Sequence, residues 1–543
     1  MMRLRRVWTA GLLAALAVSG CKRNSEERGT TARGGSKAAG DTVASAARGG
    51  PKVGGMGTLL AAGKASDLRV SPDGQFGAFL MNGQKPHLDG IPPQMLVGSL
   101  FVVPVEGGKP REVGAGVTNV PGGLLFAPDS RHLLFLTGYN PAVQSGELHV
   151  LPLTDATAEP VTLGSAVTYM LPSPDGTRLA FVDGGVLKLG PLPSGPFQSV
   201  AGEVSTAQFT PDSKTLLFKR RLTAAGGLAA VRVDAPGTLV KLADQVGDYQ
   251  VSVDGSRIAY QVRSESARGM YDLFLADAAS LKGQRLAVGS KAFAFSPDGK
   301  WLARTENGKP EQLGDLHVGP AAGGSGRKVG EAVEEFSFAP DSKAVGFLEK
   351  YDQPARAGAM TVATLPDGAP RQVGSRVPNF VWGTDSRYVA FLSRFLRPVF
   401  SVDLMLYPVG GEKAEKVGRG VFGYGFMPGN EAVIFRTNCI RDGRACDFKA
   451  LDLQDRATEP KTWLQGIYTY KVSGDGGRVL ATYARMDSDT YDVAVYDVKS
   501  QARKTLDQGV QVPAYFAGKN DSRALYIITQ GTNPGVYAAV ATP

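Results

Sequence analysis

The sequence predicts an all-β chain of repeated four-stranded units, the blades of a β-propeller, because one turn motif returns about every 45 residues. A fixed period of about 40–45 residues with a turn signature is typical of propeller blades. A second observation is that no segment shows a sustained helical period. The clearest copies of the motif are Ser71-Pro72-Asp73-Gly74, Ser173-Pro174-Asp175-Gly176 and Ser296-Pro297-Asp298-Gly299. With its variants, the repeated aspartate stands at Asp73, Asp129, Asp175, Asp212, Asp254, Asp298, Asp341, Asp385, Asp475 and Asp521, and a further weak copy is Pro428-Gly429.

The unit around Asp298 shows how each element is predicted. Residues 292–295 are a first strand, 296–299 a tight turn and 301–304 a second strand, and 315–318 and 326–329 supply the third and fourth. Each strand is bounded by Gly, Pro, Asp or Ser. In the turn, proline fixes φ, the carboxylate accepts backbone N–H groups, and Gly or Ser follows at the tight bend. We therefore expect the repeated aspartates to be structural turn residues.

The last of eleven units is expected to be completed by a strand from the start of the region 56–543. That unit supplies strands at 514–516, 524–528 and 536–540, and lacks a fourth. Residues 57–62 resemble the fourth strands of the other units, and by crossing over they would close the ring and bury its edges. Eleven units exceed the usual four to eight blades of one propeller, which slightly favours two propellers over one very large ring.

The string Phe295-Ser296-Pro297-Asp298-Gly299-Lys300-Trp301-Leu302-Ala303 resembles the PD40, or WD40-like, repeat of the TolB and prolyl oligopeptidase propellers. The resemblance covers nearly all of residues 56–543 and implies the fold, not an activity. A prolyl oligopeptidase also needs a hydrolase domain with a Gly-x-Ser-x-Gly elbow, and the sequence contains no such motif. TolB carries an α/β domain ahead of its propeller, which this sequence lacks, so the role of TolB is not transferred.

The first twenty residues predict export. Arg3, Arg5 and Arg6 precede an apolar stretch that closes at Val18-Ser19-Gly20-Cys21, which resembles the lipobox of bacterial lipoproteins. The resemblance implies that Cys21 becomes lipidated, with palmitate among its acyl chains, and anchors the chain in a membrane. Because Lys22 is not the aspartate that retains enterobacterial lipoproteins at the inner membrane, it favours the outer membrane. Residues 21–55 are rich in Gly, Ala, Ser and Thr and predict a flexible tether.

The other two cysteines predict a disulfide. Cys439 and Cys446 flank a turn-like Arg441-Asp442-Gly443-Arg444, with strand-like segments at 431–436 and 447–453 on either side. A hairpin would bring the two sulfurs opposite each other, and an oxidising compartment would keep the bond closed. A metal site is the weaker alternative, because no His or second Cys pair lies nearby.

Charge is unevenly distributed. The formal net charge is +9, but the signal segment holds three arginines and the tether a net of +4, which leaves about +2 for the remainder. No basic motif of the nucleic-acid-binding kind is present, so we expect no nucleic-acid partner. The loops between second and third strands of units four to ten carry thirteen cations against six acids, a net of +7. These cations are Lys219, Arg220, Arg221, Arg263, Arg268, Lys350, Arg356, Arg394, Arg397, Arg436, Arg441, Arg444 and Arg485.

Residues that would support an enzyme are few. The four histidines, at 87, 132, 149 and 317, show no His-x-His or His-x-x-x-His spacing, and we expect no cofactor. Asp487, Asp489 and Asp492 form a weak calcium candidate, for which a solvated loop is the stronger interpretation.

The sequence therefore favours an envelope lipoprotein whose propeller is a binding scaffold for an acidic glycan or an envelope protein. The alternative is a propeller enzyme that acts on acidic polysaccharide as a lyase or glycosidase.

Overall fold

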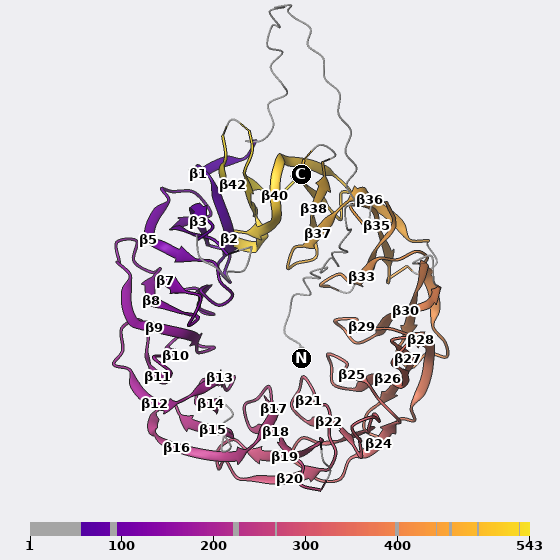
Figure 1. Ribbon diagram of the computed structural model, residues 1–543. Coiled ribbons are helices and arrows are strands. Elements are labelled where there is room, and N and C mark those ends of the chain that lie inside the picture. The colour runs from indigo at the N-terminus through magenta and orange to yellow at the C-terminus, as the bar shows by residue number, and fades with distance from the viewer. Residues whose placement is uncertain are drawn as a thin grey trace, which may run out of the picture. The chain divides into compact units, whose positions relative to one another are not determined.

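The computed structural model describes residues 56–86, 95–220, 227–266, 269–396, 401–429, 431–440, 443–455, 459–485, 488–531 and 533–543. Gly54–Pro543 is one compact unit. Its strands form eleven antiparallel four-stranded blades that follow one another around a single ring (Figure 1). The all-β propeller prediction is therefore confirmed.

The strands are assigned to the blades in chain order. Blades 1 to 3 contain β2 (Ala65–Val70), β3 (Phe76–Gln84), β4 (Val97–Pro104), β5 (Arg111–Thr118), β6 (Leu124–Phe126), β7 (His132–Asn140), β8 (Ser145–Pro152), β9 (Val161–Pro172), β10 (Arg178–Asp183), β11 (Val186–Pro191) and β12 (Gln198–Gly202). Blades 4 to 6 contain β13 (Val204–Phe209), β14 (Thr215–Arg220), β15 (Gly227–Arg232), β16 (Ala235–Asp244), β17 (Val246–Val251), β18 (Arg257–Arg263), β19 (Tyr271–Asp277), β20 (Gly283–Ala287), β21 (Phe293–Phe295), β22 (Trp301–Glu306), β23 (Asp315–Pro320) and β24 (Arg327–Gly330).

The second half of the ring repeats the arrangement. Blades 7 to 9 contain β25 (Glu335–Phe338), β26 (Ala344–Asp352), β27 (Ala357–Thr364), β28 (Arg371–Val377), β29 (Phe380–Trp382), β30 (Tyr388–Leu396), β31 (Ser401–Pro408), β32 (Glu415–Gly418), β33 (Gly423–Phe426), β34 (Ala432–Ile440), β35 (Ala445–Asp452) and β36 (Lys461–Ile467). Blades 10 and 11 contain β37 (Thr469–Val472), β38 (Arg478–Ala484), β39 (Tyr491–Asp497), β40 (Arg503–Ala517), β41 (Arg523–Ile528), β42 (Gly535–Val540) and β1 (Thr58–Ala62), with the short 3-10 helix η1 (Lys519–Asp521). The long strands β9 and β40 each serve as the last strand of one blade and the first of the next.

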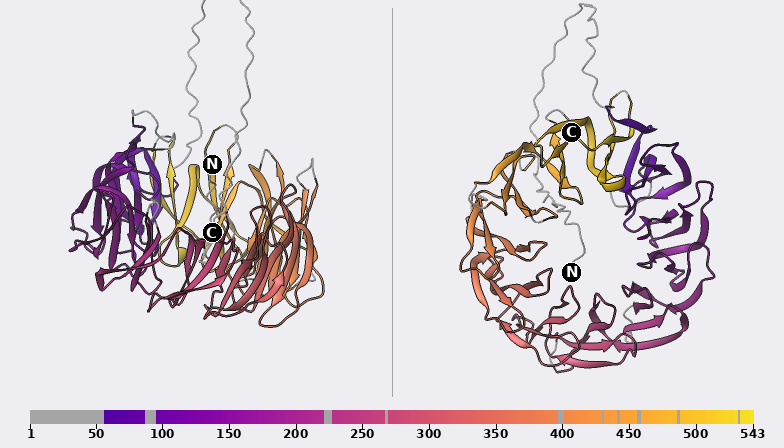
Figure 2. Two further views of the ribbon diagram at one scale, coloured as in Figure 1. Left: turned by 60° about the horizontal axis from the view of Figure 1, so that its bottom comes forward. Right: turned by 180° about the vertical axis from the view of Figure 1, so that it is seen from behind.

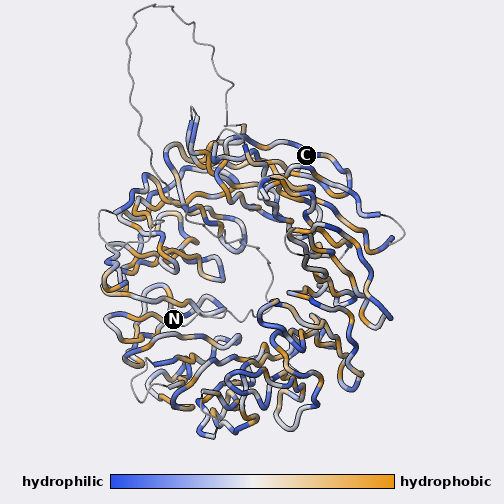
Figure 3. Tube along the Cα trace, turned by 45° about the vertical axis from the view of Figure 1, so that its right-hand side comes forward, coloured by the Kyte–Doolittle hydropathy of each residue, from blue (hydrophilic) through white to orange (hydrophobic). Residues whose placement is uncertain are grey.

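The apolar core is divided among the blade interfaces. The described residues form eleven clusters of buried side chains, and each cluster joins one blade to its neighbour, including blade 11 to blade 1. In Figure 3, apolar residues are spread around the whole ring. The second and third strands lie between two neighbours and are buried on both faces, as at Leu216–Phe218, whereas the fourth strands form a more polar outer rim.

The slight preference for two propellers is wrong. Seen from behind, the blades still run in sequence order around one ring (Figure 2, right). Ring size alone was a poor guide because stability in repeat architectures comes from each unit and its nearest neighbours. Every described interface has its own apolar cluster, so each blade of the eleven-blade ring is buried by its two neighbours.

The first described strand closes the ring, as the sequence predicts for residues 57–62. Strand β1 pairs with β42, with Thr58 opposite Ala538 and Ala62 opposite Gly535. Beside this junction, the fully buried carboxylate of Asp507 accepts hydrogen bonds from the N–H of Met56 at 3.0 Å and the hydroxyl of Tyr526 at 2.9 Å. The closing strand is therefore held by a sheet ladder and by a buried acceptor from blade 10.

The repeated turns are structural, as predicted. In the copy at Asp298, the Ser296 hydroxyl donates to the Asp298 carboxylate at 2.6 Å and accepts the N–H of Trp301 at 2.9 Å. The same carboxylate accepts the N–H of Lys300 at 3.0 Å, and Gly299 has φ 72°. Such bonds from a side chain to its own turn define the bend locally.

The turns also touch one another around the ring. In four copies the fourth turn residue is a serine whose hydroxyl accepts the N–H of the preceding blade's aspartate, as Ser342 does from Asp298 and Ser386 from Asp341, both at 2.9 Å. Ser342 and Ser386 adopt φ of 63° and 66°, a left-handed conformation that is unfavourable for serine. The inter-blade bond offsets that cost. The side-chain hydrogen bonds of the turns therefore connect neighbouring blades as well as the two strands of one blade.

Candidate functional site

The antiparallel topology separates two edges of the ring. The repeated turns lie at one edge, which we call the turn edge. Second strands end and third strands begin at the opposite edge, which we call the loop edge and which also carries the connections between blades. The tilted view shows the strands standing across the thickness of the ring between these edges (Figure 2, left).

Three of the predicted loop cations are bound within the fold, two of them to a carbonyl beyond their own blade. The Lys219 ammonium donates to the carbonyl of Gly247 in blade 5, and burial lowers the pKa of Lys219. Arg436 donates to the carbonyl of Tyr468, which precedes blade 10, at 2.5 Å. Arg485 pairs with Asp492 at 3.0 Å. Of the neighbouring cations, Arg220 is exposed and donates to the carbonyl of Gly202 at 3.3 Å.

Besides Arg220, four of the predicted cations are exposed at the loop edge: Arg263 in blade 5, Lys350 and Arg356 in blade 7, and Arg444 in blade 9. Arg221, Arg268, Arg397 and Arg441 lie outside the described residues, and so does the side chain of Arg394. The structure therefore divides the described members of the predicted cationic set into structural ties and exposed charges.

A series of acids at the loop edge was missed by the sequence reasoning. In six blades a carboxylate stands among the first three residues of the third strand, and three of these carboxylates pair with a cation of the fourth strand of the same blade. The pairs include Asp272 with Arg285 at 3.5 Å, Asp315 with Lys328 at 2.9 Å and Asp403 with Lys416 at 3.6 Å. The other members are Glu147, Asp447 and Asp492. The predicted excess of +7 was counted over the loops of units four to ten, and it left out the five of these acids that stand at strand ends in those units.

The predicted calcium candidate is not assembled by the described residues. Asp492 is occupied by Arg485, Asp489 is exposed, and Asp487 lies outside the described residues. Among the described residues, no group of three His, Cys, Asp or Glu side chains is placed to hold a metal ion.

The described histidines have local partners. His149 lies 2.8 Å from the hydroxyl of Thr137 and 3.0 Å from that of Thr162. In blade 2, His132 lies 3.7 Å from the Asp129 carboxylate. In blade 6, His317 lies 3.8 Å from the Glu306 carboxylate. Burial lowers the pKa of both His132 and His149. His87 lies outside the described residues.

The predicted disulfide is present. Cys439 and Cys446 are joined across the hairpin of β34 and β35, with their Cα atoms 4.0 Å apart. Cys446 is buried, and the loop that the bond closes lies at the loop edge of blade 9. The bond thus fixes the base of one loop that carries the exposed Arg444.

Hollows lie on the outer rim between blades 6 and 7 and between blades 9 and 10. The 6–7 rim hollow has a volume of about 400 Å³ and is lined by Lys328, Val329, Gly330, Glu331, Glu349, Thr361, Pro370 and Gln372. The 9–10 rim hollow has a volume of about 350 Å³ and is lined by Thr462, Trp463, Leu464, Gln465, Tyr496, Gln501 and Arg503.

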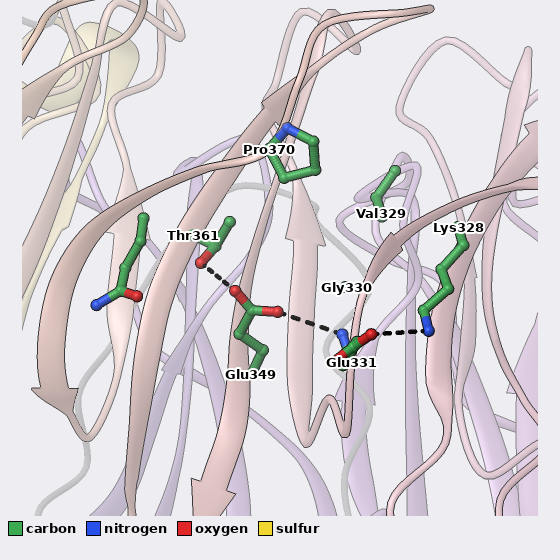
Figure 4. Close-up of a pocket in the computed structure, with 8 residues that line it drawn as sticks. Lys328, Val329, Gly330, Glu331, Glu349, Thr361 and Pro370 are labelled. Carbon is green, nitrogen blue, oxygen red and sulfur yellow. Dashed lines mark hydrogen bonds and ion pairs between the residues drawn. The ribbon is translucent and has the colours of Figure 1, made fainter.

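The charged groups of the 6–7 rim hollow satisfy one another. Figure 4 shows Lys328 reaching Glu331 at 3.0 Å and Glu349 accepting the hydroxyl of Thr361 at 2.7 Å. Glu349 also accepts the N–H of Glu331 at 3.2 Å. This network has few donors or acceptors left for a ligand.

Two solved structures that are similar to the chain match it at low sequence identity and low TM-score. No protein-family model and no curated protein sequence matches the chain. A solved structure of the eukaryotic initiation factor is similar at a TM-score of 0.42 and 10% identity, over 65% of this chain and 88% of that chain. A tricorn protease structure is similar at a TM-score of 0.27 and 12% identity, over 88% of this chain and 57% of that chain. Separately, no helix among the described residues is long and apolar enough to cross a membrane.

Proposed function

We propose that this chain is a lipid-anchored envelope lipoprotein whose ring binds an anionic partner, an acidic glycan or an acidic protein surface, through its loop edge. The lipobox-like sequence that ends at Cys21 supports the anchor, and the tether 21–55 would hold the ring away from the membrane. The ring is the binding body in this proposal.

One observation carries the binding proposal. Arg263, Lys350, Arg356 and Arg444 are exposed at the loop edge, while Lys219, Arg436 and Arg485 at the same edge are taken up by the fold. Exposed cations on one edge attract and orient a partner of opposite charge. Because the blades have a common core pattern, such irregular side chains can vary without altering the ring.

Charge reversal tests the loop edge. The variant Arg263→Glu, Lys350→Glu, Arg356→Glu should lose most retention on immobilised polygalacturonate and most capture of native envelope partners. The matched control reverses three exposed lysines of the turn edge, Lys214, Lys300 and Lys343, each of which lies beside its own turn aspartate. Equal retention of the two triple variants would contradict the proposal.

The same assay separates binding from catalysis. Incubation of the chain with polygalacturonate, with and without added divalent metal, should leave polymer length unchanged. Shortened products would instead favour the alternative, a propeller lyase or glycosidase.

A further inference from the structure

The fourth strands contain one position at which a single blade departs from the rest. In each blade the pairing of the third and fourth strands skips one residue of the fourth strand, which is a β-bulge. The skipped residues in blades 1 to 11 are Val113, Leu163, Val200, Leu242, Leu286, Val329, Val373, Val417, Trp463, Leu506 and Leu60. Ten of the eleven are Val or Leu, and only blade 9 has tryptophan.

The bulged residue has the same structural task in every blade. Each one belongs to, or packs against, the apolar cluster that joins its blade to the next. Val or Leu is therefore large enough to complete such an interface. The indole of Trp463 exceeds what the position needs, and a hollow of about 350 Å³ remains beside it. A hollow of about 400 Å³ also lies beside Val329, the bulged residue of blade 6, so the indole, and not the hollow itself, distinguishes blade 9.

The hollow combines an aromatic wall with polar side chains. The Trp463 ring lies 5.8 Å from that of Tyr496 across the blade interface. The amides of Gln465 and Gln501 are exposed, and neither makes a hydrogen bond within the described part of the chain. Binding sites for small ligands commonly pair apolar or aromatic walls with a few polar groups of this kind.

One cation supplies the charge preference. The guanidinium carbon of Arg503 lies 4.3 Å from the centre of the Tyr483 ring. Stacking uses the face of a guanidinium and leaves its edge N–H donors free to hold a carboxylate. The residues that line the hollow include no Asp or Glu. The 9–10 rim hollow thus differs from the 6–7 rim hollow, where Lys328 is already paired.

We propose that the 9–10 rim hollow binds a carboxylated pyranose, a uronic-acid unit of an acidic saccharide, with the apolar face of the sugar on Trp463 and its carboxylate at Arg503. An indole accepts the C–H face of a sugar ring, and the two glutamine amides can donate to and accept from ring hydroxyls. The site shares only the ligand class with the proposed function, because its residues lie on the outer rim and not at the loop edge.

Binding of a galacturonic acid tetramer by calorimetry tests the site, with the full chain carrying the loop-edge variant Arg263→Glu, Lys350→Glu, Arg356→Glu as the background. Adding Trp463→Leu should weaken binding by about tenfold or more, while urea unfolding stays close to that of the parent because leucine occupies this bulge in other blades. Adding Arg503→Gln should remove the preference for the tetramer over neutral cellotetraose.

A matched control and three outcomes decide the question. Lys328→Gln, which alters the cation of the 6–7 rim hollow, should leave tetramer binding unchanged. The proposal is overturned if Trp463→Leu binds like its parent, if Lys328→Gln abolishes binding, or if the parent binds neither saccharide. Loss of polymer retention in the loop-edge variant with tetramer binding intact would show that the two proposals are independent.

Discussion

The ordinary blade interfaces and the ring closure both have an apolar cluster, but they differ in the hydrogen bonds that accompany it. At an ordinary interface, such as that between blades 6 and 7, neighbours in sequence share a core and turn contacts such as that from Asp298 to Ser342. At the closure, segments more than 400 residues apart in sequence meet, and Asp507 binds Met56, Gly57 and Tyr526. The closure has an apolar cluster like every other interface, but it also depends on one buried carboxylate, Asp507, at which several hydrogen bonds meet. Substitutions should therefore cost more at the closure.

The largest effect is expected at Asp507. Asp507→Ala leaves two backbone N–H groups and the buried Tyr526 hydroxyl without their acceptor, which should cost about 3 kcal/mol in the free energy of unfolding. Hydrogen exchange should accelerate in β1 and β42 and remain slow in β21–β24. Asp507→Asn, which keeps an acceptor oxygen, should lose less. If hydrogen exchange instead accelerates equally in all blades, the closure does not unfold independently of the rest of the ring.

An intermediate effect is expected from the disulfide, which is a unique tie within a single blade. Removing it with the pair Cys439→Ser and Cys446→Ser frees a short loop, and loop entropy predicts a loss of about 2.5 kcal/mol in urea unfolding. Hydrogen exchange at β1 should not change, because the bond does not cross a blade interface. Faster hydrogen exchange at β1 would mean that unfolding of the β34–β35 hairpin promotes opening of the β1–β42 pairing.

The smallest effect is expected at a repeated turn. The Ser473 hydroxyl donates to Asp475 at 2.5 Å and accepts the N–H of Arg478 at 2.9 Å, and Ser473→Ala should cost about 1 kcal/mol at neutral pH. The bond from Ser473 lowers the pKa of Asp475 below its ordinary value of 3.8. A lowered pKa adds stability above the unfolded value, and that stability is lost as pH falls through the folded one.

The difference between wild type and Ser473→Ala should therefore begin to shrink as pH falls below 3.8, the ordinary pKa of Asp475, and should keep shrinking until pH passes below the lowered pKa of the folded protein. Urea unfolding of the two proteins from pH 7 to pH 3 measures it. Ser296→Ala is the matched copy in blade 6 and should behave alike. If the difference in unfolding free energy between the two proteins does not change with pH, the Ser473 hydroxyl stabilises the turn independently of the Asp475 carboxylate.

Local features were predictable because their physics is local. The turn at Asp298 forms its bonds within a few residues, so its aspartate could be assigned a structural role from sequence. The Cys439–Cys446 bond follows from a hairpin whose strands are adjacent in the chain. Even the long-range pairing of β1 was predictable, since only one blade lacked a fourth strand.

Site properties were harder to predict because they depend on neighbours across a blade interface. Sequence placed Lys219 and Arg436 among the loop cations, but nothing local shows that each reaches a carbonyl of the next blade. Trp463 carried a readable signal, a tryptophan where other units have Val or Leu, yet it required alignment of the bulges from the pairing register. The hollow beside it exists only once blades 9 and 10 are packed together.

The sequence by itself determined the blade, its turn chemistry and the number of repeats, because a period of turns and apolar strands records interactions within each unit. The tertiary structure alone decided that eleven blades close into one ring, since closure depends on how each interface packs and not on any single repeat. It also decided which cations are hydrogen-bonded within the fold and which are exposed, because the partner of a charged side chain can lie in a neighbouring blade, far away in the sequence.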